Sequence, residues 1–183
     1  FRRVLFRSEE GSKVSGKAKL YDTESGLKVL VHLSGVQPAG LHGIHIHENG
    51  SCDDGGKAAG GHFNPHGTDH GFLPENGAEA AHIGDMGNVE IDEDGDGLMK
   101  VVLPGVSLHE ENAVSGKAIV LHAKEDDFGQ PTGNAGERIG CGVIVSAKEW
   151  IEKMQGVHGD MGDYHGSMKG SGHGEMKGSE AEK

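Results

Sequence analysis

Aromatic side chains, prolines and long apolar runs are all scarce in this chain of 183 residues. Phe, Trp and Tyr together make up 4% of it, and there are only 5 prolines. No run of about 18 apolar residues occurs, so the sequence predicts no membrane-spanning helix. Because prolines are few and the glycines follow no three-residue period, a collagen-like protein is excluded as well.

Basic residues are also in the minority. Lys and Arg number 17 against 29 Asp and Glu, which gives a formal net charge of −12. Such a charge repels a phosphate backbone, and no basic stripe along the chain offsets it. The sequence therefore predicts no nucleic-acid partner.

Glycine and histidine are the residues in excess. Glycine occupies 33 positions, roughly 18% against a usual ~7%. Each glycine inside a helix would cost about 1 kcal/mol, so a helical bundle is disfavoured and a turn-rich β domain, a flexible tail or both remain. The 13 histidines indicate metal chemistry, and the 2 cysteines, Cys52 and Cys141, allow a single disulfide.

The first eight residues differ from the rest of the chain. Residues 1–8, FRRVLFRS, resemble the translation of a common sequencing-library adapter, and they hold three of the four arginines. We therefore predict that this octapeptide is a sequencing-adapter artefact, with a genuine basic N-terminus as the alternative. On this interpretation the native N-terminus and any signal peptide are missing, and the domain proper covers residues 9–149.

Residues 150–183 are low-complexity sequence rich in His, Met and Gly, which is typical of a flexible tail. A short helical turn over residues 148–154 is expected to precede it. A His-Gly-x-Met repeat occurs three times in the tail, and imidazole suits Cu(II) whereas thioether sulfur suits Cu(I). The repeat is therefore a candidate auxiliary copper site, with a solvated linker as the alternative. The candidate ligands are His158, Met161, His165, Met168, His173 and Met176.

The middle of the chain shows the alternation that is typical of β-strands. Apolar residues recur with a period of two, most cleanly at Leu27, Val29, Val31 and Leu33. Turns that contain glycine or proline separate the candidate strands. With a first strand that is lost or replaced by residues 1–8, the pattern predicts an all-β, eight-stranded antiparallel barrel or sandwich. The candidate strands cover residues 14–20, 27–33, 41–48, 86–92, 98–103, 115–122 and 140–147.

Three segments between these strands need an interpretation. Residues 49–85 and 123–139 lack a strand pattern, and loops that long in a compact domain are usually functional. Residues 92–97 begin like a calcium loop but place Leu103 where a bidentate carboxylate is needed. A strand-connecting turn is therefore predicted there.

The histidines have the spacing of a metal site. Alternation in Gly43-Ile44-His45-Ile46-His47 puts both imidazoles on one face of a strand and both isoleucines in the core. Three more histidines and one aspartate in the first long loop match a tetrahedral N3O zinc set, and another histidine ends a later strand. Two four-coordinate metals need eight ligand positions, which these seven residues supply if one imidazole bridges. The seven are His45, His47, His62, His70, His82, Asp85 and His122.

Four segments resemble the copper/zinc superoxide dismutase family, and the resemblance covers about residues 11–147. They are HGIHIHENGSC at 42–52, GGHFNP at 60–65, HIGDMGN at 82–88 and GNAGERIGCGVIV at 133–145. The resemblance implies a Greek-key barrel and an enzyme that disproportionates superoxide with copper and zinc as cofactors. It implies copper ligands His45, His47, His62 and His122, and zinc ligands His62, His70, His82 and Asp85.

The resemblance also implies roles for residues around the metals. Asp126 matches the aspartate that links ligands of the two metals. His62 matches the bridging histidine, which passes a proton to peroxide, and Arg138 matches the arginine that attracts and orients superoxide. Arg138 is the only arginine outside residues 1–8. A copper carrier on the same scaffold would lack part of the zinc set or this arginine, and a purely structural domain would not need seven ligands.

Cys52 and Cys141 match the family's intrachain disulfide, with two free thiols as the alternative. The remaining histidines are not expected to bind metal, because His42 matches a structural histidine and the others match no ligand position. These others are His32, His66 and His109.

Some expectations concern the whole protein. The insert at residues 72–81 and the metal-rich tail resemble bacterial secreted members, which implies a periplasmic or extracellular location. A homodimer is expected, with a monomer as the alternative. The loop from Lys124 to Arg138 lacks the Glu/Lys cluster that steers substrate in cytosolic members, so attraction of superoxide must be local, from the metals, Arg138 and either Lys57 or Lys124.

Overall fold

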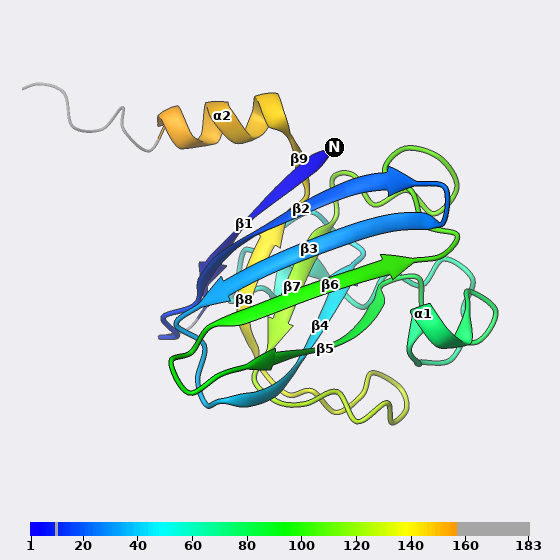
Figure 1. Ribbon diagram of the computed structural model, residues 1–183, viewed down its shortest axis with the longest axis horizontal. Coiled ribbons are helices and arrows are strands. Elements are labelled where there is room, and N and C mark those ends of the chain that lie inside the picture. Colours follow the sequence, from blue (N-terminus) through cyan, green and yellow to red (C-terminus); the bar gives the residue numbers. More distant parts are fainter. Residues whose placement is uncertain (10, 157–183) are drawn as a thin grey trace, which may run out of the picture.

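The computed structural model describes residues 1–9 and 11–156, and strands are the main regular secondary structure of this part of the chain (Figure 1). The helices are η1 (Lys57–Ala59), α1 (Leu73–Asn76) and α2 (Ala147–Gly156), and α2 includes the predicted helical turn. Among the described residues, no helix has the length and apolar character that a membrane crossing requires. The strands are β1 (Arg2–Ser8), β2 (Ser15–Thr23), β3 (Gly26–Ser34), β4 (Gly40–His47), β5 (Asp85–Ile91), β6 (Gly97–Leu103), β7 (Ala118–His122), β8 (Arg138–Val143) and β9 (Val145–Ser146).

The strands form one closed antiparallel sheet. Their order is β2-β3-β6-β5-β4-β7-β8-β1-β9, and a further pairing of β1 with β2 closes the barrel. The pairings of β3 with β6 and of β4 with β7 join strands that are not consecutive, which is the Greek-key arrangement. Strand β9 has 2 residues and continues beyond β8 along β1. The predicted eight-stranded Greek-key barrel is therefore confirmed.

The period-two pattern of β3 fills the barrel interior. Leu27, Val29, Val31 and Leu33 are at most 2% exposed, and the residues between them face outward. Aliphatic side chains from the other strands pack against them, which removes apolar surface from water. The largest fully buried side chains are Leu20, Leu27, Leu33, Ile44, Ile46, Leu73, Ile83, Met86, Leu103, Ile119, Leu121 and Ile144.

Residues 2–8 supply the first strand of the barrel. Val4 and Phe6 are 0% and 2% exposed, and Val4 lies opposite Ala18 of β2. Of the two expectations for the first strand, loss or replacement, the structure therefore supports replacement. That the octapeptide is a sequencing artefact stays a prediction.

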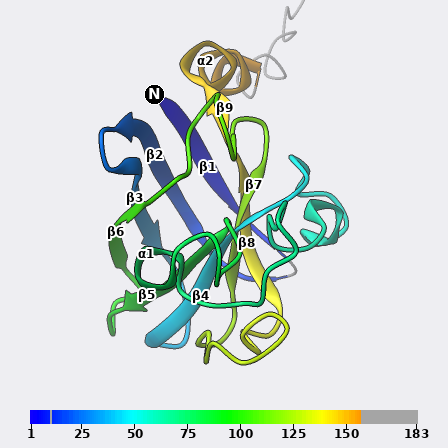
Figure 2. The same cartoon turned by 90° about the vertical axis from the view of Figure 1, so that its right-hand side faces the viewer.

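The two long connections lie on the same side of the barrel (Figure 2). The first joins β4 to β5 and carries η1 and α1, and the second joins β7 to β8. A disulfide between Cys52 and Cys141, with a Cα–Cα distance of 5.7 Å, attaches the first connection to β8 and confirms the predicted pairing. The six candidate copper ligands from His158 to Met176 lie outside the described residues.

Residues 92–97 form the predicted turn between β5 and β6. Asp92 Oδ1 accepts hydrogen bonds from the backbone N–H groups of Asp94 and Asp96, over 3.0 Å and 2.9 Å. Because the Asp92 side chain accepts hydrogen bonds from the backbone of its own turn, the turn has the Asx-type stabilisation that is expected of a tight connection.

Candidate metal centre

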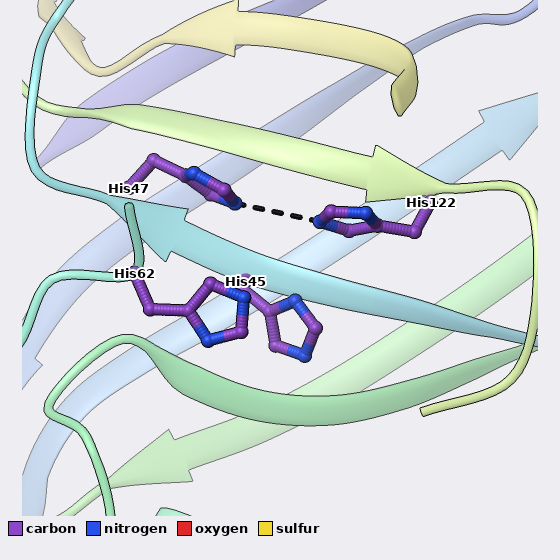
Figure 3. A group of neighbouring side chains, drawn as sticks. All are labelled: His45, His47, His62 and His122. Carbon is purple, nitrogen blue, oxygen red and sulfur yellow. Dashed lines mark hydrogen bonds between the residues drawn. The ribbon is translucent and has the colours of Figure 1, made fainter. Parts of the chain in front are cut away.

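Three histidines lie on neighbouring strands along one wall of the barrel (Figure 3). His45 and His47 belong to β4, and His122 ends β7, which pairs with β4. Ile44 and Ile46, which alternate with them, are 0% exposed in the core. The alternation along β4 thus places both imidazoles on the same face, as the sequence predicts.

His62 reaches these three histidines from the connection between β4 and β5. A β-bridge pairs it with His47, and its ring centroid lies 4.1 Å from that of His45. One nitrogen from each of the four rings lies within 4.8 Å of the others, and all four residues are buried. We call this group the strand set: His45, His47, His62 and His122.

In three members of the strand set, one of the two ring nitrogens contacts an oxygen atom, which leaves the other nitrogen for a metal. His47 Nδ1 and His122 Nδ1 contact backbone carbonyls of the two connections at 3.0 Å and 3.1 Å, and His45 Nε2 contacts Asp126 Oδ2 at 2.7 Å. As a result, the Nε2 atoms of His47 and His122 face each other across 3.4 Å, and His45 Nδ1 is buried without a hydrogen-bond partner. Metal-binding histidines are oriented in this way, with the second ring nitrogen bonded to a carbonyl or carboxylate.

A second group surrounds Asp85 at the start of β5. His62 Nδ1 and His82 Nδ1 lie 2.9 Å and 3.2 Å from Asp85 Oδ1, and His70 Nδ1 lies 2.9 Å from Oδ2. The backbone N–H groups of Gly71 and His82 also donate to Oδ2, which fixes the carboxylate. We call this group the loop set: His62, His70, His82 and Asp85.

Both groups fit a metal ion. His70 Nδ1 is buried without a hydrogen-bond partner despite its 2.9 Å distance to Asp85, so a polar atom there is unsatisfied. Three imidazole nitrogens and one carboxylate oxygen are a tetrahedral zinc donor set, and four imidazoles suit copper. The structure brings together all seven predicted ligands, and His62 is a member of both sets.

Burial keeps three of these imidazoles neutral, which is the form that binds a metal. It lowers the pKa of His47 to about 2, of His122 to about 3 and of His62 to about 4. Burial also lowers the pKa of His70, but the adjacent carboxylates of Asp126 and Asp85 outweigh it and raise the value to about 9.

Asp85 is an ionised carboxylate. Burial raises its pKa, but contacts with the histidines of the loop set outweigh this effect and hold the pKa well below its usual range. The loop set therefore offers a negative charge to a cation, whereas the strand set is built from imidazoles alone.

Asp126, in the connection between β7 and β8, contacts one histidine of each set. Its Oδ2 contacts His45 Nε2 at 2.7 Å and its Oδ1 contacts His70 Nε2 at 2.9 Å. Asn88 of β5 holds Asp126 in place, because Asn88 Nδ2 donates to the Asp126 carbonyl and Asn88 Oδ1 accepts from its N–H. The carboxylate is thus fixed between one ligand of each set.

Arg138 lies beside the strand set. Its guanidinium donates to the carbonyls of Gly56 and Gly60, the latter over 2.6 Å, and the Gly60 carbonyl also contacts His47 Nδ1. The disulfide at Cys52 anchors this part of the connection, since the N–H of Gly56 donates to the Cys52 carbonyl. One carbonyl therefore couples the position of Arg138 to that of a strand-set histidine.

The histidines that match no ligand position lie elsewhere. Both ring nitrogens of His42 contact backbone carbonyls at 2.8 Å, so neither is available to a metal. His32 is exposed on β3, His66 contacts Asn112, and His109 contacts Arg2.

Several groups that hold the ligands do not follow from sequence reasoning. The carbonyls of Gly60 and Gly136 orient His47 and His122, but every residue has a carbonyl and no pattern marks these two. Asn88 stands within the HIGDMGN motif, which gives a position but not a role. In the second connection, Phe128 and Gln130 contact His70, and nothing in the sequence indicates it.

Comparison with known proteins agrees with this geometry. Residues 14–144 match the sequence model of the family described as copper/zinc superoxide dismutase. The chain is 42% identical over 153 residues to an extracellular copper-zinc superoxide dismutase of Haemonchus contortus, covering 78% of this chain and 81% of that protein. It is also 42% identical over 139 residues to copper-zinc superoxide dismutase 2 of Aquifex aeolicus, covering 72% and 80%.

A viral protein is similar to the same extent. The copper-zinc superoxide dismutase of Paramecium bursaria Chlorella virus 1 is 40% identical over 143 residues, covering 74% of this chain and 75% of the viral one. The similar proteins thus come from a nematode, a bacterium and a virus. Since the family match covers most of the chain and coincides with the two linked ligand sets, the chain belongs to the copper/zinc superoxide dismutase family.

Proposed function

We propose that the protein converts two superoxide anions and two protons to O2 and H2O2. The observation that carries this proposal is the sharing of His62 between the strand set and the loop set. When bound, copper supplies one-electron chemistry by alternating between Cu(II) and Cu(I), and zinc supplies a second positive charge beside the shared imidazole. The strand set His45, His47, His62 and His122 would hold copper, and the loop set His62, His70, His82 and Asp85 would hold zinc.

His62 is the residue we assign to proton transfer. Its Nδ1 contacts Asp85 at 2.9 Å, and its ring lies 4.1 Å from that of His45 and 5.1 Å from that of His47 between centroids. The ring nitrogen that is not directed at Asp85 therefore belongs to the strand set. In our proposal this nitrogen takes up a proton and delivers it to the departing peroxide.

Arg138 is the residue we assign to binding the anion. Its guanidinium donates hydrogen bonds to two backbone carbonyls, so the positive charge has a fixed place beside the strand set. A cavity of about 290 Å³ is lined by Arg138 and Lys57 together with the acidic residues Glu9 and Glu137. Lys57 lines this cavity and Lys124 lies against Gly136 at its edge, so either can be the second cation that attracts superoxide in a chain of net charge −12.

The test is superoxide disproportionation by protein loaded with copper and zinc. We expect rapid disproportionation by the unchanged chain and loss of most of the activity in His62→Ala. His66→Ala is the matched control, because His66 is an exposed histidine of the same connection. A chain that holds both metals without activity would contradict the function, and full activity of His62→Ala would contradict the bridging role.

We further propose that the protein works outside the cytoplasm as a homodimer of the bacterial secreted type. Two relatives carry the name extracellular superoxide dismutase, and the disulfide is compatible with an oxidising compartment. The upstream genomic sequence tests the location, since it would encode a signal peptide. Light scattering of the purified chain tests the dimer against the monomer.

We make a separate proposal for each end of the chain. The repeats from His158 to Met176 would gather copper when it is scarce, so truncation after Gly156 should lower copper loading only at limiting copper. Residues 1–8 would be absent from the native gene, and sequencing of the source locus decides this.

A further inference from the structure

His70 lies in the connection between β4 and β5, far from either strand along the chain. Unlike His45, His47 and His122, it belongs to no strand. Ligands on connections are held less accurately than ligands on strands unless neighbouring groups support them. The position of His70 therefore depends on the groups that contact its backbone and its ring.

Gln130 bonds to both polar backbone groups of His70. The N–H of His70 donates to Gln130 Oε1 over 2.9 Å, and Gln130 Nε2 donates to the His70 carbonyl over 2.9 Å. A primary amide offers one acceptor and one donor side by side, so it can pair with one residue's N–H and C=O together. Two such bonds restrict both the position and the rotation of the His70 backbone.

The ring of Phe128 lies nearly parallel to the imidazole of the same residue. Its ring is stacked on that of His70, with centroids 6.4 Å apart and planes at 19°, and it also contacts the ring of Phe72 at 6.0 Å. Phe72 in turn lies against Gly87 of β5, where a Cβ would come within 2.8 Å of the Phe72 ring. The aromatic pair thus links β5, His70 and the second connection.

The backbone of Phe128 is in an unfavourable conformation. Its φ of 59° lies in the left-handed region, which bulky side chains rarely adopt. In this conformation its N–H donates to Asp126 Oδ1 over 2.8 Å, and the same oxygen contacts His70 Nε2 at 2.9 Å. The strained residue therefore contributes to two contacts at once, the ring stack and the Asp126 bond.

We propose that Phe128 and Gln130 form a clamp that positions His70 and slows the release of zinc from the loop set. This inference rests on the proposed zinc site. The clamp comes from the connection between β7 and β8, whereas His70 lies between β4 and β5, so zinc retention depends on contact between the two connections. Both residues are positioning residues, because their contacts reach the ligand and not the metal.

The test is the rate at which a chelating dye takes zinc from protein loaded with copper and zinc. We expect Gln130→Ala to release zinc about 10- to 100-fold faster, the usual consequence of removing a group that orients a metal ligand. The visible spectrum of Co(II) in the zinc position should change in the same variant, because the His70 ring is no longer fixed. Glu125→Gln is the matched control, since Glu125 is an exposed residue of the same connection.

Phe128→Gly separates positioning from folding. Glycine adopts a positive φ without strain, so this variant should leave the metal-free chain at least as stable against urea while releasing zinc faster. Release rates within twofold of the unchanged chain in both variants would overturn the clamp. If the unchanged chain bound no zinc, the proposed zinc site itself would fail, and the clamp with it.

Discussion

The two ligand sets are held by different parts of the fold. Three of the four histidines of the strand set lie on β4 and β7, where backbone ladders fix their position and backbone carbonyls fix the rings of His47 and His122. The residues of the loop set other than Asp85 lie on one connection. There the rings are oriented by carboxylates, Asp85 and Asp126, and by side chains of the other connection.

This difference indicates how each set responds to change. The strand set depends on main-chain geometry that a single side-chain substitution rarely disturbs, apart from substitution of the ligands. The loop set depends on side chains that meet across two connections, so its metal affinity should be sensitive to residues that are not ligands. The variants below test this contrast, from the largest expected effect to the smallest.

Removing a strand-set ligand should have the largest effect. We expect His47→Ala to lower superoxide disproportionation to the level of copper-free protein, because His47 belongs to the proposed copper set and not to the loop set. Zinc content, measured by mass spectrometry, should stay the same. Loss of zinc together with copper would show that the sets are not independent, and His32→Ala on the exposed face of β3 is the control.

The disulfide should have the next largest effect. Replacing both Cys52 and Cys141 by Ser should destabilise the metal-free chain by about 4 to 5 kcal/mol, because the bond closes a long loop in the unfolded chain. Urea unfolding measures this, and the unchanged chain in reductant should behave like the variant. Since the bond anchors the Gly56 segment beside Arg138, activity should fall while zinc release stays the same.

The same contrast between strands and connections explains which parts of the site can be predicted from the sequence. Period-two alternation predicts β4 and the side-by-side placement of His45 and His47, because strand geometry maps spacing directly onto faces. The connections have no such period. A count of ligands there indicates a shared imidazole, but the division into two sets depends on the family resemblance.

Other features of the site and of the barrel depend on tertiary contacts that no sequence pattern indicates. Gln130 and His70 are separated by 60 positions, and their pairing depends on how two connections meet. Val4 and Phe6 show that residues 2–8 fit as a barrel strand, although the arginines around them point to a foreign octapeptide. The alternation of apolar residues, and not the origin of the segment, determines that it can pair with β2.

Asp126→Asn tests the link between the sets. The two carboxylate oxygens face His45 Nε2 and His70 Nε2, whereas an amide offers only one acceptor and turns its NH2 toward the other ring. We expect zinc affinity to fall about 10- to 100-fold and copper affinity to fall less, because β4 still fixes His45. Competition with chelators of known affinity measures both, and equal losses would contradict the contrast between strand and loop.

The smallest effect is expected for Arg138→Lys, and it separates attraction of the anion from its orientation. Lysine keeps the positive charge, but its single ammonium cannot reproduce the fork that donates to the carbonyls of Gly56 and Gly60. If attraction alone mattered, kcat/KM and its decrease with ionic strength would both be unchanged. We expect kcat/KM to fall roughly two- to tenfold with the same dependence on ionic strength, because the charge remains while its fixed direction is lost. Zinc release should not change, since the ligands next to Arg138 belong to the strand set: His47 shares the Gly60 carbonyl with it, and His122 lies opposite it in the pairing of β7 with β8. A variant in which zinc release did accelerate would show that the strand set and the loop set are coupled through this side of the barrel as well as through Asp126.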